Sequence, residues 1–127
     1  MIDHVSLGVA DLDRAARFYE AVLGAIGFTK LEVRPATIGF GKSYPEFWLN
    51  HRATMPAVAA DTGVHVCLRA RSSEAVDAFY AAALAAGGSG DGAPGVRPHR
   101  TGGYYAAFVR DLDGNRIEAV TFLPSER

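Results

Sequence analysis

The sequence is poor in the features that mark several classes of protein. Its 127 residues include one cysteine, so no disulfide can form within the chain, and a reducing cytoplasmic setting is expected. The formal net charge is −1 at pH 7, with no long basic stretch, which argues against a nucleic-acid partner because phosphate binding needs a concentrated positive face. No apolar run reaches membrane-spanning length, and the start of the chain does not resemble an export signal. We therefore expect one soluble cytoplasmic domain over residues 1–127 that binds neither nucleic acid nor membrane.

What the sequence does contain is an internal repeat with a period of 61 residues. The segment His-Val-Ser-Leu that starts at His4 recurs as His-Val-Cys-Leu from His65, and a Phe-Tyr pair, a leucine and a glycine follow at matching positions in both copies. A fixed period of this kind indicates one supersecondary unit used twice. Because each copy begins with a histidine, a cavity between the copies would receive two imidazoles, which is the start of a metal site.

Each half shows the same order of predicted elements. Residues 2–9 alternate between apolar and polar side chains, as in a strand with one buried face, and Asp11 is a good N-cap for a helix that ends near Gly24 or Gly27. Three short extended runs follow. The second half repeats this order with Ser72 or Ser73 as the cap, whereas the glycine-rich stretch 87–95 is interpreted as a flexible connector. We expect two modules, about 1–58 and about 62–124, each reading strand, helix, strand, strand, strand.

The strand pattern places four candidate residues on one side of the sheets. Along the strands that begin or end each half, the apolar side chains fall on one face, and the other face carries His4, Trp48, His65 and Glu118. If the helices cover the apolar faces, these four line the opposite, concave surface. Two histidines and a glutamate that converge there can hold a divalent first-row metal such as Fe, Mn, Ni or Zn and leave positions open for water or substrate. Taken singly, each has a plainer interpretation as a hydrogen-bonded strand histidine or a solvated glutamate.

Three segments of the sequence resemble a known family. They are Asp3-His4 with Asp11-Leu-Asp13 and Phe18-Tyr19, then Gly63-Val-His65-Val, and finally Asp111-Leu-Asp113-Gly114-Asn115-Arg-Ile-Glu118. Together they are similar to the vicinal oxygen chelate superfamily, which contains glyoxalase I, extradiol dioxygenases and bleomycin resistance proteins. The resemblance implies an α+β fold in which two βαβββ modules form a cupped, mostly antiparallel sheet with helices on the outer face. It also implies a homodimer, in which modules are often exchanged between subunits, and a metal held by His4, His65 and Glu118.

Two departures from that pattern bear on the substrate. Trp48 stands where, by the resemblance, glyoxalase I has a fourth ligand, a glutamate that also moves the proton, so a general base must come from elsewhere. Gly8 stands where the bacterial type of glyoxalase I presents an arginine to glutathione. Glutathione hemithioacetal is therefore not favoured as the substrate.

Other residues are candidates for catalysis or for substrate binding. Tyr104 and Tyr105 straddle a strand, so one of them should face the cup. Cys67 lies on the same strand face as His65, where it is either a reactive thiol or, more simply, a small buried apolar residue. Candidates for substrate contacts, with the core or a solvated loop as the plainer alternatives, are Trp48, Phe40, Phe108, His99 and Arg100.

The sequence thus predicts a small metal-dependent enzyme that acts on an oxygenated small molecule. Lyase or isomerase chemistry through an enolate-like species and ring-opening oxygenation both fit the predicted ligand set. The alternative is a binding protein of the bleomycin-resistance type that sequesters a drug or metabolite in the cup. Such a protein has no need of two histidines and a glutamate, so this set favours an enzyme.

Overall fold

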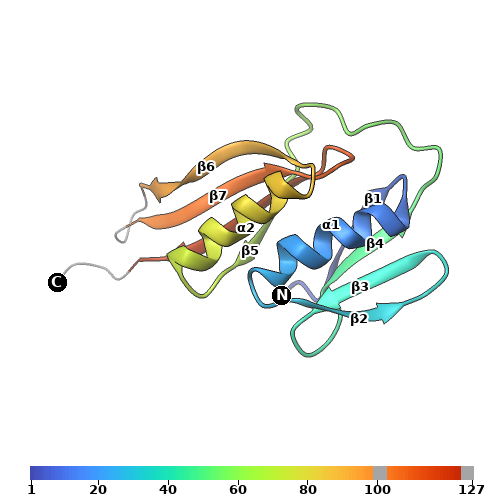
Figure 1. Ribbon diagram of the computed structural model, residues 1–127, viewed down its shortest axis with the longest axis horizontal. Helices are drawn as coiled ribbons and strands as arrows, with labels where there is room; N and C mark the ends of the chain where they lie inside the picture. Colours follow the sequence, from blue (N-terminus) through green and yellow to red (C-terminus); the bar gives the residue numbers. More distant parts are fainter. Residues whose placement is uncertain (99–102, 124–127) are drawn as a thin grey trace.

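The two halves of the chain fold into two four-stranded sheets, each accompanied by one helix (Figure 1). The computed structural model describes residues 1–98 and 103–123. The first half consists of β1 (Val5–Val9), α1 (Leu12–Gly24), β2 (Thr29–Val33), β3 (Thr37–Gly41) and β4 (Phe47–His51). The second half consists of β5 (Val66–Arg69), α2 (Ser73–Ala85), β6 (Ser89–Arg97), β7 (Tyr104–Arg110) and β8 (Arg116–Phe122). Each half is a βαβββ unit, so the predicted α+β class is confirmed.

Strand pairing is the same in both sheets. The orders are β1-β4-β3-β2 and β5-β8-β7-β6, and in each sheet only the first pair is parallel. Ser6 lies opposite Trp48 in the first sheet, and Cys67 lies opposite Glu118 in the second. Since Ser6 and Cys67 are repeat equivalents, Trp48 and Glu118 occupy corresponding positions in the two units, as the repeat predicts.

The N-cap residues predicted for the two helices cap them in the structure. The side chain of Asp11 accepts a hydrogen bond from the Arg14 backbone N–H, and the Ser72 hydroxyl accepts one from the Ala75 N–H. Each bond satisfies one of the free N–H groups in the first turn of a helix. Within the described residues, no helix has the length and apolar character needed to cross a membrane.

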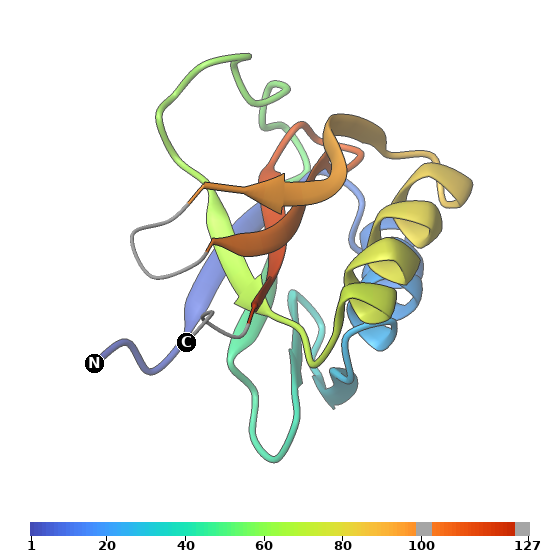
Figure 2. The ribbon, with the colours of Figure 1, turned by 90° about the vertical axis from the view of Figure 1, so that its left-hand side faces the viewer.

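Both helices lie on the same side of the two sheets (Figure 2). They pack against each other and cover the apolar strand faces, where the core includes the fully buried Tyr19 and Phe47, whose ring centroids are 5.1 Å apart. The opposite face of each sheet carries no helix (Figure 2). Along each strand, the side chains that alternate with the core side chains therefore face this helix-free side.

The glycine-rich stretch is where the sequence prediction is wrong. Residues 87–95 were expected to form a flexible connector, but nearly all of them belong to β6, which pairs with β7 through two register shifts. Strand pairing uses main-chain groups only, so a run with few side chains can still form a strand. The neighbours also require small residues, because a Cβ added at Gly92 would lie 3.0 Å from Cδ1 of Phe108.

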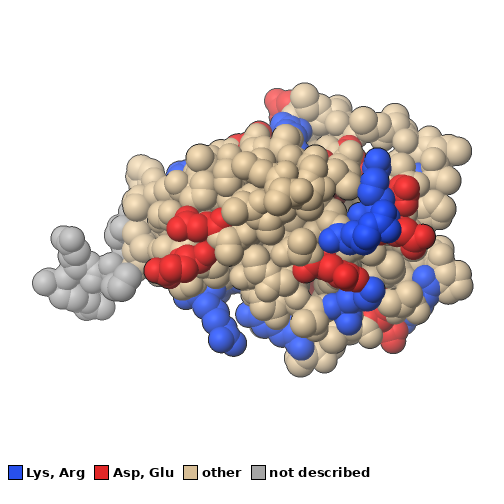
Figure 3. Space-filling model, viewed as in Figure 1, with Lys and Arg blue, Asp and Glu red and all other residues tan. Residues whose placement is uncertain are grey.

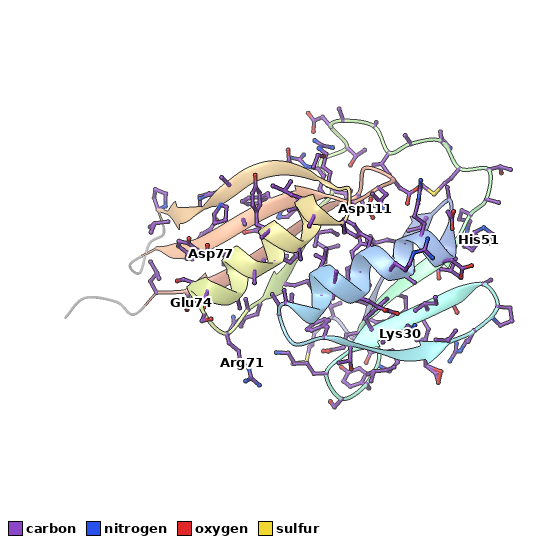
Figure 4. All side chains as sticks on the ribbon, viewed as in Figure 1. Lys30, His51, Arg71, Glu74, Asp77 and Asp111 are labelled. Carbon is purple, nitrogen blue, oxygen red and sulfur yellow. The ribbon has the colours of Figure 1, made fainter. Side chains whose placement is uncertain are left out.

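The turn between β7 and β8 ties the second unit to the first. Asp111 lies where the two units meet (Figure 4) and accepts a hydrogen bond of 2.6 Å from the buried Tyr19 hydroxyl. The Ala10 backbone N–H donates to Asp113 at 3.1 Å, and the side-chain amide of Asn115 donates to the Gly8 carbonyl at 3.0 Å. The predicted hairpin turn therefore also provides polar contacts between the two halves of the chain.

Candidate metal centre

The second sheet brings a histidine and a buried carboxylate together on its helix-free face. His65 Nε2 lies 2.9 Å from Oε1 of Glu118, and the Glu118 side chain is only 6% exposed. Phe108 lies directly across from Glu118 in the β7–β8 pair, and its ring centroid is 5.9 Å from that of His65. A buried carboxylate is costly unless it is paired or bound to a metal. Here it is paired with a half-exposed imidazole, next to an aromatic wall.

The spacing of this pair fits a shared metal ion. Nitrogen and oxygen ligands bind first-row divalent metals at about 2.1 Å, so two donors on one ion at a right angle are about 3 Å apart. His65 Nε2 and Glu118 Oε1 already have nearly this separation. Their chemistry, one imidazole and one carboxylate, also suits such a metal.

The third predicted ligand lies apart from this pair within one chain. His4 Nδ1 is 2.8 Å from the Asp3 carboxylate, and the His4 side chain is 52% exposed. Over residues 1–98 and 103–123, no group of three or more His, Cys, Asp or Glu residues is placed to hold a metal. A carboxylate on one ring nitrogen is the usual support for a histidine that binds metal through the other. Asp3 thus leaves Nε2 of His4 available.

A groove of about 340 Å³ separates the two histidine-bearing strand edges. Residues at the start of β1, with His4, line one side, and residues of β5, with His65 and Cys67, line the other. Each of these strands is the edge of its own sheet, and Figure 2 shows them running in opposite directions. Both histidines therefore lie beside strand edges that pair with no other described strand.

Cys67 differs from the simpler expectation. It was expected to be a small buried residue, but it is exposed on the face that carries His65 and Glu118. Although the residue as a whole is exposed, its thiol group is partly shielded from water; this desolvation, followed by the nearby negative charge of Glu118, raises the pKa of Cys67 to about 12. The thiol is therefore protonated at neutral pH, which does not favour a thiolate nucleophile.

The two tyrosines face opposite sides of β7, as their positions predict. Tyr105 packs partly against the core, and its hydroxyl donates a hydrogen bond of 2.6 Å to Asp77 on α2, which raises the pKa of the phenol. Tyr104 shares the helix-free side with Phe108 but is paired with Phe122 at the far end of β8. Four residues of strand, about 13 Å, separate it from the position opposite Glu118. Neither tyrosine lies beside the His65–Glu118 pair.

The predicted substrate contacts fall in three places. Phe108 borders the His65–Glu118 pair, and Trp48 lies on the corresponding face of the first sheet. Phe40 is completely buried in the core, so it has no surface to offer a ligand. His99 and Arg100 lie outside the described residues.

Sequence reasoning missed Arg34, whose guanidinium carbon lies 4.9 Å from the centroid of the Trp48 ring. It lies just beyond β2, outside the repeat and outside every strand pattern, so no periodic signal marks it.

Comparison with known proteins places the chain in a family. The profile of the Glyoxalase/Bleomycin resistance protein/Dioxygenase superfamily matches residues 1–119. The chain belongs to this superfamily. It is 32% identical over 117 residues to the virulence protein STM3117 of Salmonella typhimurium, which covers 92% of this chain and 81% of that protein.

Solved structures of the superfamily show the same fold. A glyoxalase/bleomycin resistance protein from Albidiferax ferrireducens matches with a TM-score of 0.82 and 32% identity, over 93% of this chain and 96% of that one. A variant of the fosfomycin resistance protein FosX from Listeria monocytogenes, in complex with Mn(II) and 1S,2S-dihydroxypropylphosphonic acid, matches with a TM-score of 0.68. Its identity is 18%, over 94% of this chain and 87% of that one, so this second likeness concerns the fold alone.

In this superfamily member, the position of Trp48 depends on a glycine beneath it. A Cβ added at Gly39 would lie 2.9 Å from Cζ3 of Trp48 and 2.9 Å from Cβ of Pro45. Gly39→Ala is therefore expected to displace the indole and to lower the free energy of unfolding by about 1–3 kcal/mol, the usual range for overpacking. Trp48 is the only tryptophan, so its emission spectrum reports the displacement directly. Gly24→Ala, where nothing lies within 4 Å of the added Cβ, is the control. An unchanged emission spectrum in Gly39→Ala would contradict the packing described.

Proposed function

We propose that this protein is a metal-dependent enzyme that acts on an oxygenated small molecule. The observation that carries the proposal is the 2.9 Å contact between His65 and the buried Glu118 on the helix-free face of the second sheet. His65, Glu118 and His4 would hold a divalent ion such as Fe, Mn, Ni or Zn. When bound, the ion supplies Lewis-acid stabilisation of negative charge on a substrate oxygen. The FosX variant, which shares the fold, is in complex with Mn(II), one of the ions proposed here.

We further propose that His4 comes from a second copy of the chain. In the described part of one chain His4 lies apart from the pair, and both histidines lie beside strand edges that pair with no other described strand. A symmetric dimer would create two equivalent sites, each with one histidine from one protomer and the His65–Glu118 pair from its partner. Asp3 then orients the incoming imidazole, and Phe108 restricts access of water on one side.

Metal binding by ligand variants tests the proposal. After treatment with a chelator, wild-type protein should take up close to one Mn(II) or Zn(II) per chain. His4→Ala, His65→Ala and Glu118→Gln should each bind the metal at least 10- to 100-fold more weakly, because even the loss of an outer partner has effects of this size. His51→Ala is the matched control, since His51 (Figure 4) is exposed at the end of β4, which belongs to the first sheet, whereas the pair belongs to the second. Unchanged metal uptake in all three ligand variants would refute the proposal.

The class of reaction follows from a second measurement on the metal-loaded protein. A lyase or isomerase should accept several divalent metals and be indifferent to oxygen, whereas a ring-opening dioxygenase should need Fe(II) and consume oxygen. Both reaction classes use a metal held by histidine and glutamate. The His65–Glu118 pair therefore supports metal binding but does not distinguish between the two reactions.

A second candidate function is sequestration of a drug or metabolite without catalysis. The separation of His4 from the pair within one chain favours this alternative, because a single chain then presents two donors and an open groove of about 340 Å³. Tight binding of a small molecule by chelator-treated protein, with no effect of the three ligand substitutions, would favour it over the enzyme.

A further inference from the structure

A second pocket, of about 420 Å³, lies on the helix-free face of the first sheet. The side chains of β1, β3 and β4 that point away from the core form its floor, and Arg34 forms part of its wall. We propose that this pocket binds a carboxylate, phosphate or phosphonate group of the substrate, with Arg34 as the principal donor. This inference rests on the proposed function, because the pocket meets the metal centre at His4, which lines both the pocket and the groove.

Arg34 is held in place and still has donors to offer. Its guanidinium is stacked on the indole of Trp48, with 4.9 Å between the guanidinium carbon and the ring centroid. Nε lies 3.8 Å from the Glu32 carboxylate, a long ion pair between side chains that are 59% and 42% exposed. Such an exposed pair contributes little and does not neutralise the arginine for a ligand. A guanidinium has five N–H donors in a planar fork that matches the oxygens of an oxyanion.

Neutral polar side chains complete the pocket around Arg34. Thr37 and Asn50 lie opposite each other in the β3–β4 pair, and Ser6 lies opposite Trp48 in the β1–β4 pair. All three line the pocket, and their hydroxyl and amide groups can each donate a hydrogen bond to an oxyanion. Trp48 itself packs closely over Gly39, so the stacked arginine lies against an indole that contacts the sheet. A preorganised charged donor with neutral donors beside it is the usual composition of an oxyanion site.

Among the described residues, one carboxylate lines this pocket, and it lies beside His4. Asp3 is engaged with His4 Nδ1 at 2.8 Å, so its charge faces an imidazole. The pocket therefore has a cationic end at Arg34 and a potential metal-binding end at His4. A ligand that spans both ends would carry an oxyanion at one end and chelating hydroxyl or carbonyl oxygens at the other. Small hydroxy acids, keto acids and phosphonates have this pattern.

The single tryptophan makes the test direct, since Trp48 forms part of the pocket. Mandelate is used as the probe and mandelamide as its uncharged counterpart, both with chelator-treated, metal-free protein. Mandelate should change Trp48 fluorescence saturably, and mandelamide should bind at least about 10-fold more weakly, because a charged hydrogen bond is lost. Arg34→Gln should weaken mandelate binding about 10-fold, as measured by both fluorescence and calorimetry. Arg17→Gln, an exposed arginine on α1, is the matched control and should bind mandelate like the wild type.

Three results would overturn the inference: no saturable binding of mandelate to wild-type protein, equal binding of mandelate and mandelamide, or equal binding by wild type and Arg34→Gln. Metal uptake by Arg34→Gln is measured in parallel and should equal that of the wild type. Because the probe is titrated without metal, a failure of the metal proposal leaves this result standing, and a failure here leaves metal uptake intact.

Discussion

Replacing Asp111 with alanine is expected to lower the free energy of unfolding by about 3–5 kcal/mol, because four hydrogen bonds to one buried carboxylate are lost at once. The Asp111 side chain accepts from the Tyr19 hydroxyl at 2.6 Å, from the side-chain amide of Asn115 at 2.9 Å, and from the backbone N–H groups of Asp113 at 2.9 Å and Asn115 at 2.8 Å. The carboxylate is 6% exposed, so water can replace few of these bonds.

Urea denaturation at one protein concentration, followed by circular dichroism, measures this effect. Asp61→Ala is the matched control, since Asp61 is exposed in the segment between β4 and β5, and its loss should change stability by less than about 0.5 kcal/mol. If Asp111→Ala lowers the free energy of unfolding no more than Asp61→Ala does, the packing of the two halves does not depend on the Asp111 carboxylate.

The same carboxylate gives the stability a defined dependence on pH. Burial raises the pKa of Asp111 above its ordinary value of 3.8, although the hydrogen bonds from Tyr19 and Asn115 act in the opposite direction. The folded state therefore holds this proton more tightly than the unfolded state does, and the resulting stabilisation is complete below pH 3.8. It is lost as the pH rises through the folded-state pKa. Relative to Asp111→Asn, which does not titrate, wild-type stability should fall with rising pH across this window, and a flat or rising difference would contradict the shift.

Mixing two variants that each lack one proposed metal ligand is expected to restore metal binding. In His4→Ala both sites of the proposed dimer lack the first imidazole, and in Glu118→Gln both lack the carboxylate. If each site takes His4 from one protomer and Glu118 from the other, a mixed dimer has one site with all three ligands. Random exchange at equal concentrations yields mixed dimers in half of the population, so about one quarter of the wild-type sites should reappear.

A second mixture separates this result from nonspecific recovery. His65 and Glu118 contact each other within one chain, so both lie on the same protomer in every site. A mixture of His65→Ala and Glu118→Gln should therefore recover no sites. Metal titration after unfolding and refolding of the mixed chains measures both cases. If the first mixture also recovers none, while the wild type binds metal, the three ligands come from a single chain.

Much of this architecture could be predicted because it depends on local sequence patterns that occur twice. The repeat that starts at His4 and His65 predicted two equivalent units, and Asp11 and Ser72 cap the helices as expected. Alternation along the strands placed His65 and Glu118 on one face, where the structure brings them together. These signals depend on residues a few positions apart, or on strand faces that a period of two determines.

The features that could not be predicted depend on contacts between distant parts of the chain. β6 forms because β7 offers a partner strand, which a run rich in glycine does not reveal. The bond from Tyr19 to Asp111 joins residues 92 positions apart, and the stacking of Arg34 on Trp48 requires the space that Gly39 leaves. The separation of His4 from His65 and Glu118 depends on how the two units pack together, and neither repeat alone carries a signal for that packing.

Acidic and basic side chains are interspersed on the face shown in Figure 3, without a broad area of one sign. Recognition of charge in the proposed site would then depend on single residues such as Arg34 rather than on the overall field of the protein.

The segment between β4 and β5, residues 52–65, has neither helix nor strand, and among the described strands every ladder lies wholly before or wholly after it. A protease cut there would break the polypeptide without removing a single strand pair. Hydrogen bonds from Val58 to Asp113 and from Arg110 to Ala60 would still hold the cut ends against the β7–β8 turn. We therefore expect the two halves, produced as separate fragments, to reassemble into the same pair of sheets.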